Sequence, residues 1–254
     1  MTRRYLVVFL TVCLLAGLSY GEAQRTVFSH ENKLPERHQL EAGLKATFVQ
    51  YPREDYSTVI ERDELAGAPY LRFAVFENMV LNAEIPYVSI SPKYGDSEQG
   101  FGDATVGAEF LPWQDIFGYP YILPHVSVAL PTGDEDKNMG MGETRTQFGV
   151  SVGTTVEDVY HFVADVSYLM YRDRGNEISI SGAVIWDLSD QFSLHLETLV
   201  INDREVGPES NNPIYIIGGM SFRATEQLQF SAYGGSARQA EEDVIAGGKV
   251  SYSF

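Results

Sequence analysis

The chain has 254 residues, of which 18 are basic and 35 acidic, and its formal net charge is −17 at pH 7. A chain this acidic excludes nucleic-acid binding through phosphate contacts, because that mode needs a basic surface. The only cysteine, Cys13, lies near the N-terminus. We therefore expect neither a disulfide framework nor thiol chemistry in the mature protein.

Residues 1–23 have the form of a secretory signal peptide. Two arginines precede an apolar run over residues 5–18, and small residues follow, with Ala23 as a candidate cleavage position. The apolar run is shorter than the roughly 20 residues that a membrane-spanning helix needs. We therefore expect export of the chain, followed by a short periplasmic arm formed by the polar residues 24–38.

Twelve segments then alternate between apolar and polar residues, which is typical of half-buried strands. They cover residues 39–51, 69–77, 80–91, 101–112, 120–131, 145–156, 160–172, 177–188, 191–202, 213–223, 227–235 and 243–254. Most are long enough for a tilted strand that crosses a membrane, which takes about 9–11 residues. The charged run in residues 55–68 predicts a loop, and Pro86 would remove a ladder hydrogen bond from the third strand.

The connections between these segments alternate between short and long. Long polar connections are expected near residues 52–68, 92–100, 132–144, 203–212 and 236–242. Residues 113–119 are an exception, because they form a longer connection at a place where a short turn is expected. Outer-membrane barrels combine short periplasmic turns with long external loops. Residues 39–254 thus predict an all-β fold, a transmembrane antiparallel up-and-down β-barrel of about twelve strands in a Gram-negative outer membrane.

The two faces of the strands differ in charge. One phase is almost free of charged residues, as expected for a face in lipid, where Arg or Lys at the midplane costs about 2–4 kcal/mol. The opposite phase predicts a polar lumen. Its lining candidates are Glu41, Lys45, Arg72, Glu84, Asp103, Glu109, His125, His161, Asp165, Asp187, His195, Glu197, Arg223 and Lys249.

The last strand ends on an aromatic residue at the C-terminus. Val250, Tyr252 and Phe254 alternate with polar residues. This ending resembles the signal that the outer-membrane barrel assembly machinery reads, so Tyr252 and Phe254 are the candidate assembly signal. The expected partners are therefore outer-membrane lipid and that machinery.

Three stretches carry a family resemblance: Gly100-Phe101-Gly102-Asp103-Ala104-Thr105-Val106-Gly107-Ala108-Glu109-Phe110, then Val126-Ser127-Val128-Ala129-Leu130-Pro131-Thr132-Gly133-Asp134, and then Phe148-Gly149-Val150-Ser151-Val152-Gly153. Their order and spacing resemble the outer-membrane barrel family named for the MetA pathway of phenol degradation. The resemblance implies a porin-like transporter for small, often aromatic or hydrophobic, compounds. It carries over no binding residue.

The expected function is an outer-membrane channel for such compounds. The alternative is a non-conducting structural or adhesion barrel, whose lumen would be filled by paired charges such as Lys45, Arg72, Glu84 and Glu109. A barrel-embedded lipid hydrolase is the least favoured, because the strand histidines face inward and no nucleophile elbow, a G-x-S-x-G sequence at a strand-to-helix turn, is expected. We expect no enzymatic activity and no cofactor.

Histidines and carboxylates of the lumen phase form one candidate cluster. His161, Asp187 and His195 lie on adjacent predicted strands, with Glu197 and Asp165 one pleat further in. This residue set can bind zinc or another divalent metal. The favoured interpretation is a hydrogen-bonded polar plug, because a slip of one residue in register would disperse the set. No metal is therefore expected.

Overall fold

The computed structural model describes residues 23–51, 62–113, 120–172, 175–203, 214–238 and 244–254. The predicted signal peptide falls outside them except for Ala23. The elements are β1 (Leu40–Tyr51), β2 (Arg62–Phe76), β3 (Met79–Glu84), β4 (Tyr87–Pro92), β5 (Glu98–Phe101), β6 (Thr105–Phe110), β7 (Tyr121–Ala129), the 3-10 helix η2 (Glu135–Lys137), β8 (Arg145–Val156), β9 (Tyr160–Met170), β10 (Glu177–Asp187), β11 (Phe192–Asp203), β12 (Ile214–Arg223), β13 (Leu228–Arg238) and β14 (Val244–Ser253).

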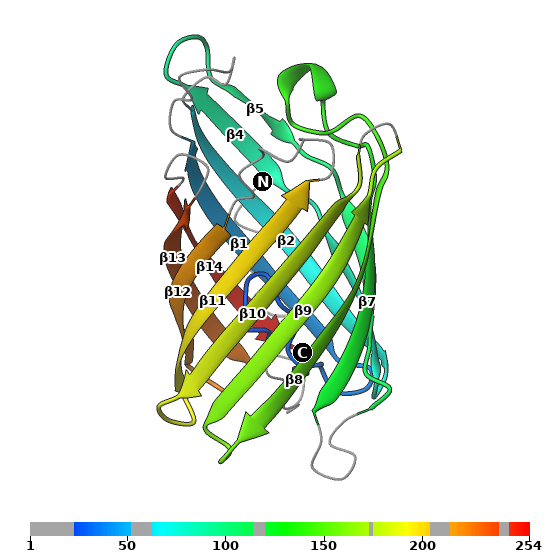
Figure 1. The fold of residues 1–254 in the computed structure, drawn as a ribbon, viewed down its shortest axis with the longest axis vertical. Coiled ribbons are helices and arrows are strands. Elements are labelled where there is room, and N and C mark those ends of the chain that lie inside the picture. The colour runs from blue at the N-terminus through cyan, green and yellow to red at the C-terminus, as the bar shows by residue number, and fades with distance from the viewer. Residues whose placement is uncertain (1–22, 52–61, 114–119, 173–174, 204–213, 239–243) are drawn as a thin grey trace, which may run out of the picture.

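The strands form one closed antiparallel barrel (Figure 1). Strand β1 pairs with both β14 and β2, which closes the sheet on itself. One half of β2 pairs with β3 and the other half with β4, so β3 and β4 form a single interrupted strand, as do β5 and β6 beside them. Within the described residues the barrel therefore has twelve strands, as the sequence predicted.

Pro86 accounts for the interruption between β3 and β4, as expected from its missing N–H group. The neighbouring strand breaks at the same level, between Phe101 and Thr105. Here the Gly102 N–H donates to the Pro86 carbonyl at 2.8 Å. A Cβ on Gly102 would lie 2.9 Å from the Pro86 ring, so the close approach of the two breaks requires glycine.

The loop predicted over residues 55–68 is wrong for its second half. Strand β2 begins at Arg62, which pairs with Tyr51 at the far end of β1. Consecutive charged residues at this end of the strand made it look like a loop in the sequence. The strand tolerates these charges because Asp63 is exposed and stays hydrated. Residues 52–61 lie outside the described part of the chain.

The outward face of the wall is apolar and the inward face is mixed. On β2, Leu71 and Phe73 are 50% and 40% exposed, whereas Arg72 between them is only 5% exposed. The interior also contains apolar side chains, including the fully buried Ile185 and Ile217. Within the described residues, no helix is long and apolar enough to cross a bilayer.

The described loop over residues 130–144, at the upper end of the barrel in Figure 1, is longer than the described turns over residues 157–159 and 188–191 at its lower end. The loop that contains η2 is anchored rather than freely solvated, which differs from the sequence expectation. The Asp103 carboxylate accepts hydrogen bonds from the amides of Gly133 and Met141, both at 3.0 Å. Met139 is buried against Val88 and Ile90. Asp103, expected to line the lumen, therefore fixes this loop.

Candidate functional site

The segment before β1 lies inside the barrel, not in the periplasm as its polar sequence predicted. In Figure 1 this dark-blue segment loops within the lower half of the barrel. Its side chains and amides bond to inward-facing residues of β10 and β11. We call residues 24–38 the arm. Its charges complement those of the wall, and this pairing explains why a hydrophilic segment is stable there.

Glu197 on β11 holds the arm through its backbone. Its carboxylate accepts hydrogen bonds from the amides of Val27, Phe28 and Ser29 at 2.8, 2.9 and 2.6 Å, and from the Ser29 hydroxyl at 2.5 Å. Consecutive amides that converge in this way form an anion-binding nest. Because Glu197 is 1% exposed, these bonds compensate a carboxylate that is otherwise withdrawn from water.

An ion pair stabilises the arm and fastens it to the lower part of the wall. Arg25 forms a salt bridge with Glu31 at 2.8 Å, and both side chains are buried. The Arg25 guanidinium also pairs with Asp187 on β10 and donates to the Ser193 hydroxyl at 3.2 Å. Arg25 therefore links the arm to two neighbouring strands.

Acid is expected to loosen the arm through Glu31. Burial alone would raise the pKa of the Glu31 carboxyl, but the Arg25 charge and its hydrogen bonds hold the pKa below the ordinary value of 4.5. The stabilisation is therefore complete above pH 4.5 and is lost as the pH falls through the lower pKa of the docked state. Hydrogen exchange of the arm amides, corrected for intrinsic rates, should show decreasing protection from pH 5 to pH 3.

The matched variant for this titration is Glu31→Gln. It should show weaker protection already at pH 5 and a smaller loss on acidification. An equal loss in both proteins would mean that other carboxylates control the arm.

Beside the arm, β1, β2 and β6 contribute a buried triad. The Arg72 guanidinium lies 2.7 Å from the Glu41 carboxylate and 2.9 Å from the Glu109 carboxylate. Arg72 also donates to the Lys33 carbonyl of the arm at 3.1 Å, and the Tyr70 hydroxyl donates to Glu41 at 2.8 Å. Three of the predicted lumen residues thus meet at one point of the wall.

A second group joins β7, β9 and the arm. His125 Nε2 lies 2.7 Å from Asp165 Oδ2, and the His30 ring of the arm stacks on the His125 ring with 4.0 Å between centroids. The His125 ring reaches Asp165 by crossing Gly149 on the intervening strand β8, where an added Cβ would lie 2.2 Å from the ring. Glycine at position 149 therefore makes contact across a strand feasible.

The cluster predicted around His161 and His195 is divided in the structure. His161 Nε2 lies 2.6 Å from Asp187, but register places Ile185 between His161 and His195. Both ring nitrogens of His195 are buried without a hydrogen-bond partner among the described residues. Glu197 accepts hydrogen bonds from the arm instead of from a histidine.

The remaining predicted residues lie at different levels of the barrel. Lys45 pairs with Glu84 at 2.5 Å, and Lys249 donates to the Gln24 carbonyl of the arm. Arg223 is at the lower rim, where it donates to the Asp190 carbonyl at 3.1 Å. The arm residues were not predicted from the sequence to line the lumen. Their available signal was the close spacing of charges in a segment without periodicity.

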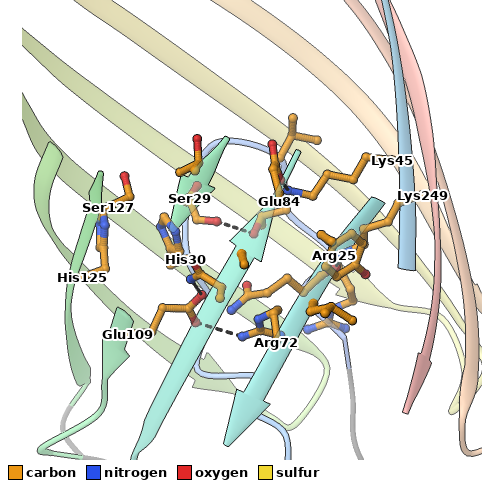
Figure 2. Close-up of a pocket in the computed structure, with 18 of the residues that line it drawn as sticks. Arg25, Ser29, His30, Lys45, Arg72, Glu84, Glu109, His125, Ser127 and Lys249 are labelled. Carbon is orange, nitrogen blue, oxygen red and sulfur yellow. Dashed lines mark hydrogen bonds and ion pairs between the residues drawn. The ribbon is translucent and has the colours of Figure 1, made fainter. Parts of the chain in front are cut away.

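The arm lies between two cavities. The upper cavity has a volume of about 400 Å³ and is lined by the arm, by Arg72 and Glu109, and by the lysines of β1 and β14 (Figure 2). The lower cavity has a volume of about 440 Å³ and is lined by Arg25, Lys33 and residues of the lower turns. Arg25 contributes to both walls, so the arm narrows the passage between the cavities.

A closed antiparallel barrel with an apolar outer face and buried ion pairs inside defines the class of outer-membrane β-barrels. The chain matches the family of the putative MetA-pathway of phenol degradation over residues 23–254, and it belongs to this family. A comparison with curated protein sequences finds no match.

Solved structures with the same fold include several outer-membrane barrels. The COG4313 outer membrane channel from Pseudomonas putida F1 superposes with a TM-score of 0.72, at 11% identity, over 92% of this chain and 100% of that one. The KdgM porin, solved with disordered oligogalacturonate, has a TM-score of 0.56 at 12% identity, over 84% of this chain and 99% of that one. The translocator domain of the autotransporter NalP from Neisseria meningitidis has a TM-score of 0.54 at 12% identity, over 99% and 93%.

Proposed function

We propose that the protein is an outer-membrane channel for small compounds, in which the arm narrows the lumen. The observation that carries this proposal is the upper cavity of about 400 Å³ enclosed by the barrel wall. Its volume lies within the roughly 300–1,000 Å³ of typical small-molecule sites. The membership of the phenol-degradation family supports aromatic compounds as the class of solute.

The wall of the upper cavity supports the same class of solute. The ammonium groups of Lys45 and Lys249 lie 5.2 and 5.9 Å from the centroid of the Tyr70 ring. Figure 2 shows both lysines extending toward the cavity from β1 and β14. Aromatic and cationic groups in one wall favour a flat solute with a polar or acidic substituent.

The alternative is a non-conducting structural barrel. The paired charges and the docked arm favour it, since the Arg72 triad and the ion pair between Arg25 and Glu31 lie inside the barrel and are buried. The upper cavity favours the channel, because a fully packed lumen would leave no such volume. A lipid hydrolase receives no support: His125 and His195 are buried inside the barrel, away from lipid, and we propose no enzymatic activity.

We also propose that the chain is exported, cleaved after Ala23 and inserted by the barrel assembly machinery into outer-membrane lipid. The C-terminal signal would be Tyr252 and Phe254, whose rings lie 4.8 Å apart at the end of β14. The Phe254 amide donates to the Leu40 carbonyl at 2.8 Å, so the same residue helps to close the seam between β14 and β1.

Single-channel recording in planar bilayers tests the channel function. The wild-type barrel should give discrete openings that a small aromatic acid blocks. Glu197→Gln should open more often, because each hydrogen bond to a charged group contributes about 1.5–3 kcal/mol and this substitution removes the charge. Glu226→Gln, at an exposed turn position, should behave as wild type. A folded barrel that is silent in all three forms would support the structural alternative.

A further inference from the structure

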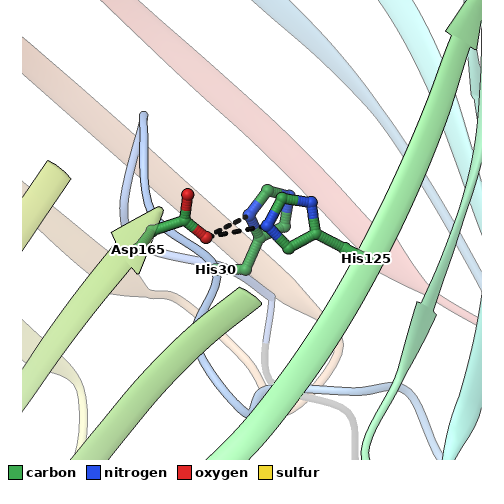
Figure 3. A group of neighbouring side chains, drawn as sticks. All are labelled: His30, His125 and Asp165. Atoms are coloured by element: carbon green, nitrogen blue, oxygen red, sulfur yellow. Dashed lines mark hydrogen bonds and ion pairs between the residues drawn. The ribbon is translucent and has the colours of Figure 1, made fainter. Parts of the chain in front are cut away.

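We propose that His30, His125 and Asp165 bind one divalent transition-metal ion, with Zn²⁺ as the best fit, and that the ion fastens the arm to the wall. Figure 3 shows both rings directed at one carboxylate. The sequence predicted no metal site, and the candidate cluster lay around His161 and His195, because the arm that contains His30 was expected in the periplasm.

The donor atoms are close enough for one ion. All three lie within 4.8 Å of one another, and Asp165 Oδ2 is 2.7 Å from His125 Nε2 and 3.8 Å from His30 Nδ1. Zinc bonds of 2.0–2.2 Å place tetrahedral donors about 3.3 Å apart. Shifts of about an ångström, mainly in the two rings, would therefore complete the site.

His30 presents a buried nitrogen that lacks a hydrogen bond. Its Nδ1 is inaccessible to solvent and has no hydrogen-bond partner among the described residues, since 3.8 Å to Asp165 is too long. An orphaned buried imidazole nitrogen is costly unless an ion or water satisfies it. This atom is directed at the carboxylate, where an ion would satisfy it.

Other residues hold the ligands in place. The Ser167 hydroxyl donates to Asp165 Oδ1 at 2.7 Å, and the Ser151 hydroxyl donates to Oδ2. Gly149 leaves the space through which the His125 ring reaches β9. Hydrogen-bonded carboxylates and fixed rings are the outer-shell support that metal sites use.

The site is accessible from one side only. Asp165 and His125 are buried, whereas the His30 side chain is 31% exposed, and both histidines line the upper cavity. An ion would therefore enter from the lumen, and its remaining coordination position would face the cavity. The bound ion would join β7, β9 and the arm, so it would oppose release of the arm.

Zinc titration of tag-free, refolded barrel by calorimetry tests the site. The matched variants are His30→Asn and His38→Asn, because His38 is the other arm histidine, is exposed and has a positive φ that asparagine tolerates. Wild type and His38→Asn should bind one Zn²⁺ per chain. His30→Asn should bind at least about 100-fold more weakly, since even outer-shell losses cost 10–100-fold.

Hydrogen exchange of the arm provides a second readout. Zn²⁺ should increase protection of the arm amides in wild type and His38→Asn, and a chelator should reverse the effect. Equal zinc binding in all three proteins, or none in wild type, would overturn the proposal. Neither measurement depends on conductance, so this result and the test of the channel are separate.

Discussion

Deletion of residues 24–38 is expected to raise the single-channel conductance severalfold. The arm separates the two cavities and is the part of the described chain that crosses the lumen between them. Removing it would join the cavities into one water-filled path through the barrel. Because ion flow is limited by the narrowest constriction, the gain should exceed that of Glu197→Gln, which only weakens docking.

The control for the deletion is a test that the shortened chain still folds into a barrel. Strand β1 begins at Leu40 and pairs with β14 and β2 through its own residues, and the deletion removes one adjoining hydrogen bond, from the His38 amide to the Ala74 carbonyl of β2. The deleted protein should therefore keep the heat-modifiable gel mobility of a folded barrel. Unchanged conductance in a folded deletion variant would show that another part of the chain closes the lumen.

Substitution of Arg72 by methionine is expected to cost about 3–5 kcal/mol of stability, the usual penalty for breaking a buried ion pair. Arg72 is 5% exposed, and its removal would leave the carboxylates of Glu41 and Glu109 buried without their cation. Urea unfolding of the barrel in lipid vesicles would measure the loss. Arg37→Met serves as the control, since Arg37 is exposed before β1.

A triple variant distinguishes lost attraction from stranded charge. Arg72→Met combined with Glu41→Gln and Glu109→Gln removes the whole charged set, and we expect it to recover most of the stability. If the triple variant is as unstable as Arg72→Met alone, packing of the arginine side chain would account for the loss. In that case the two carboxylates contribute little.

The strand plan was accessible from sequence because a membrane wall imposes a simple code. Lipid outside and ion pairs inside force strict alternation, which made most strand bounds predictable. The break at Pro86 was predictable because proline lacks the N–H group of a ladder hydrogen bond. The start of β2 was missed because its end carries consecutive charges, which alternation alone cannot distinguish from a loop. The strand continues there because Arg62 still has a partner in Tyr51.

The side chains and the arm that fill the lumen were less predictable. Their positions depend on strand register and on the arm, whose sequence has no hydrophobic periodicity. One residue, Ile185, separates His161 from His195, and no sequence signal fixes such a register. The arm has no periodicity, and its position is decided by partners far away in the chain. Arg25 docks because its positive charge meets the carboxylate of Asp187 on the wall.

The hydrogen bonds to Glu197 also carry information about the order of assembly. They join residues that are about 170 positions apart in the chain, and contacts of such long range form late in folding. The middle hairpins must be in place before Val27 and Phe28 have an acceptor. The arm is therefore expected to dock last, although it precedes every strand in the sequence, and the lumen should be at its widest just after the barrel closes.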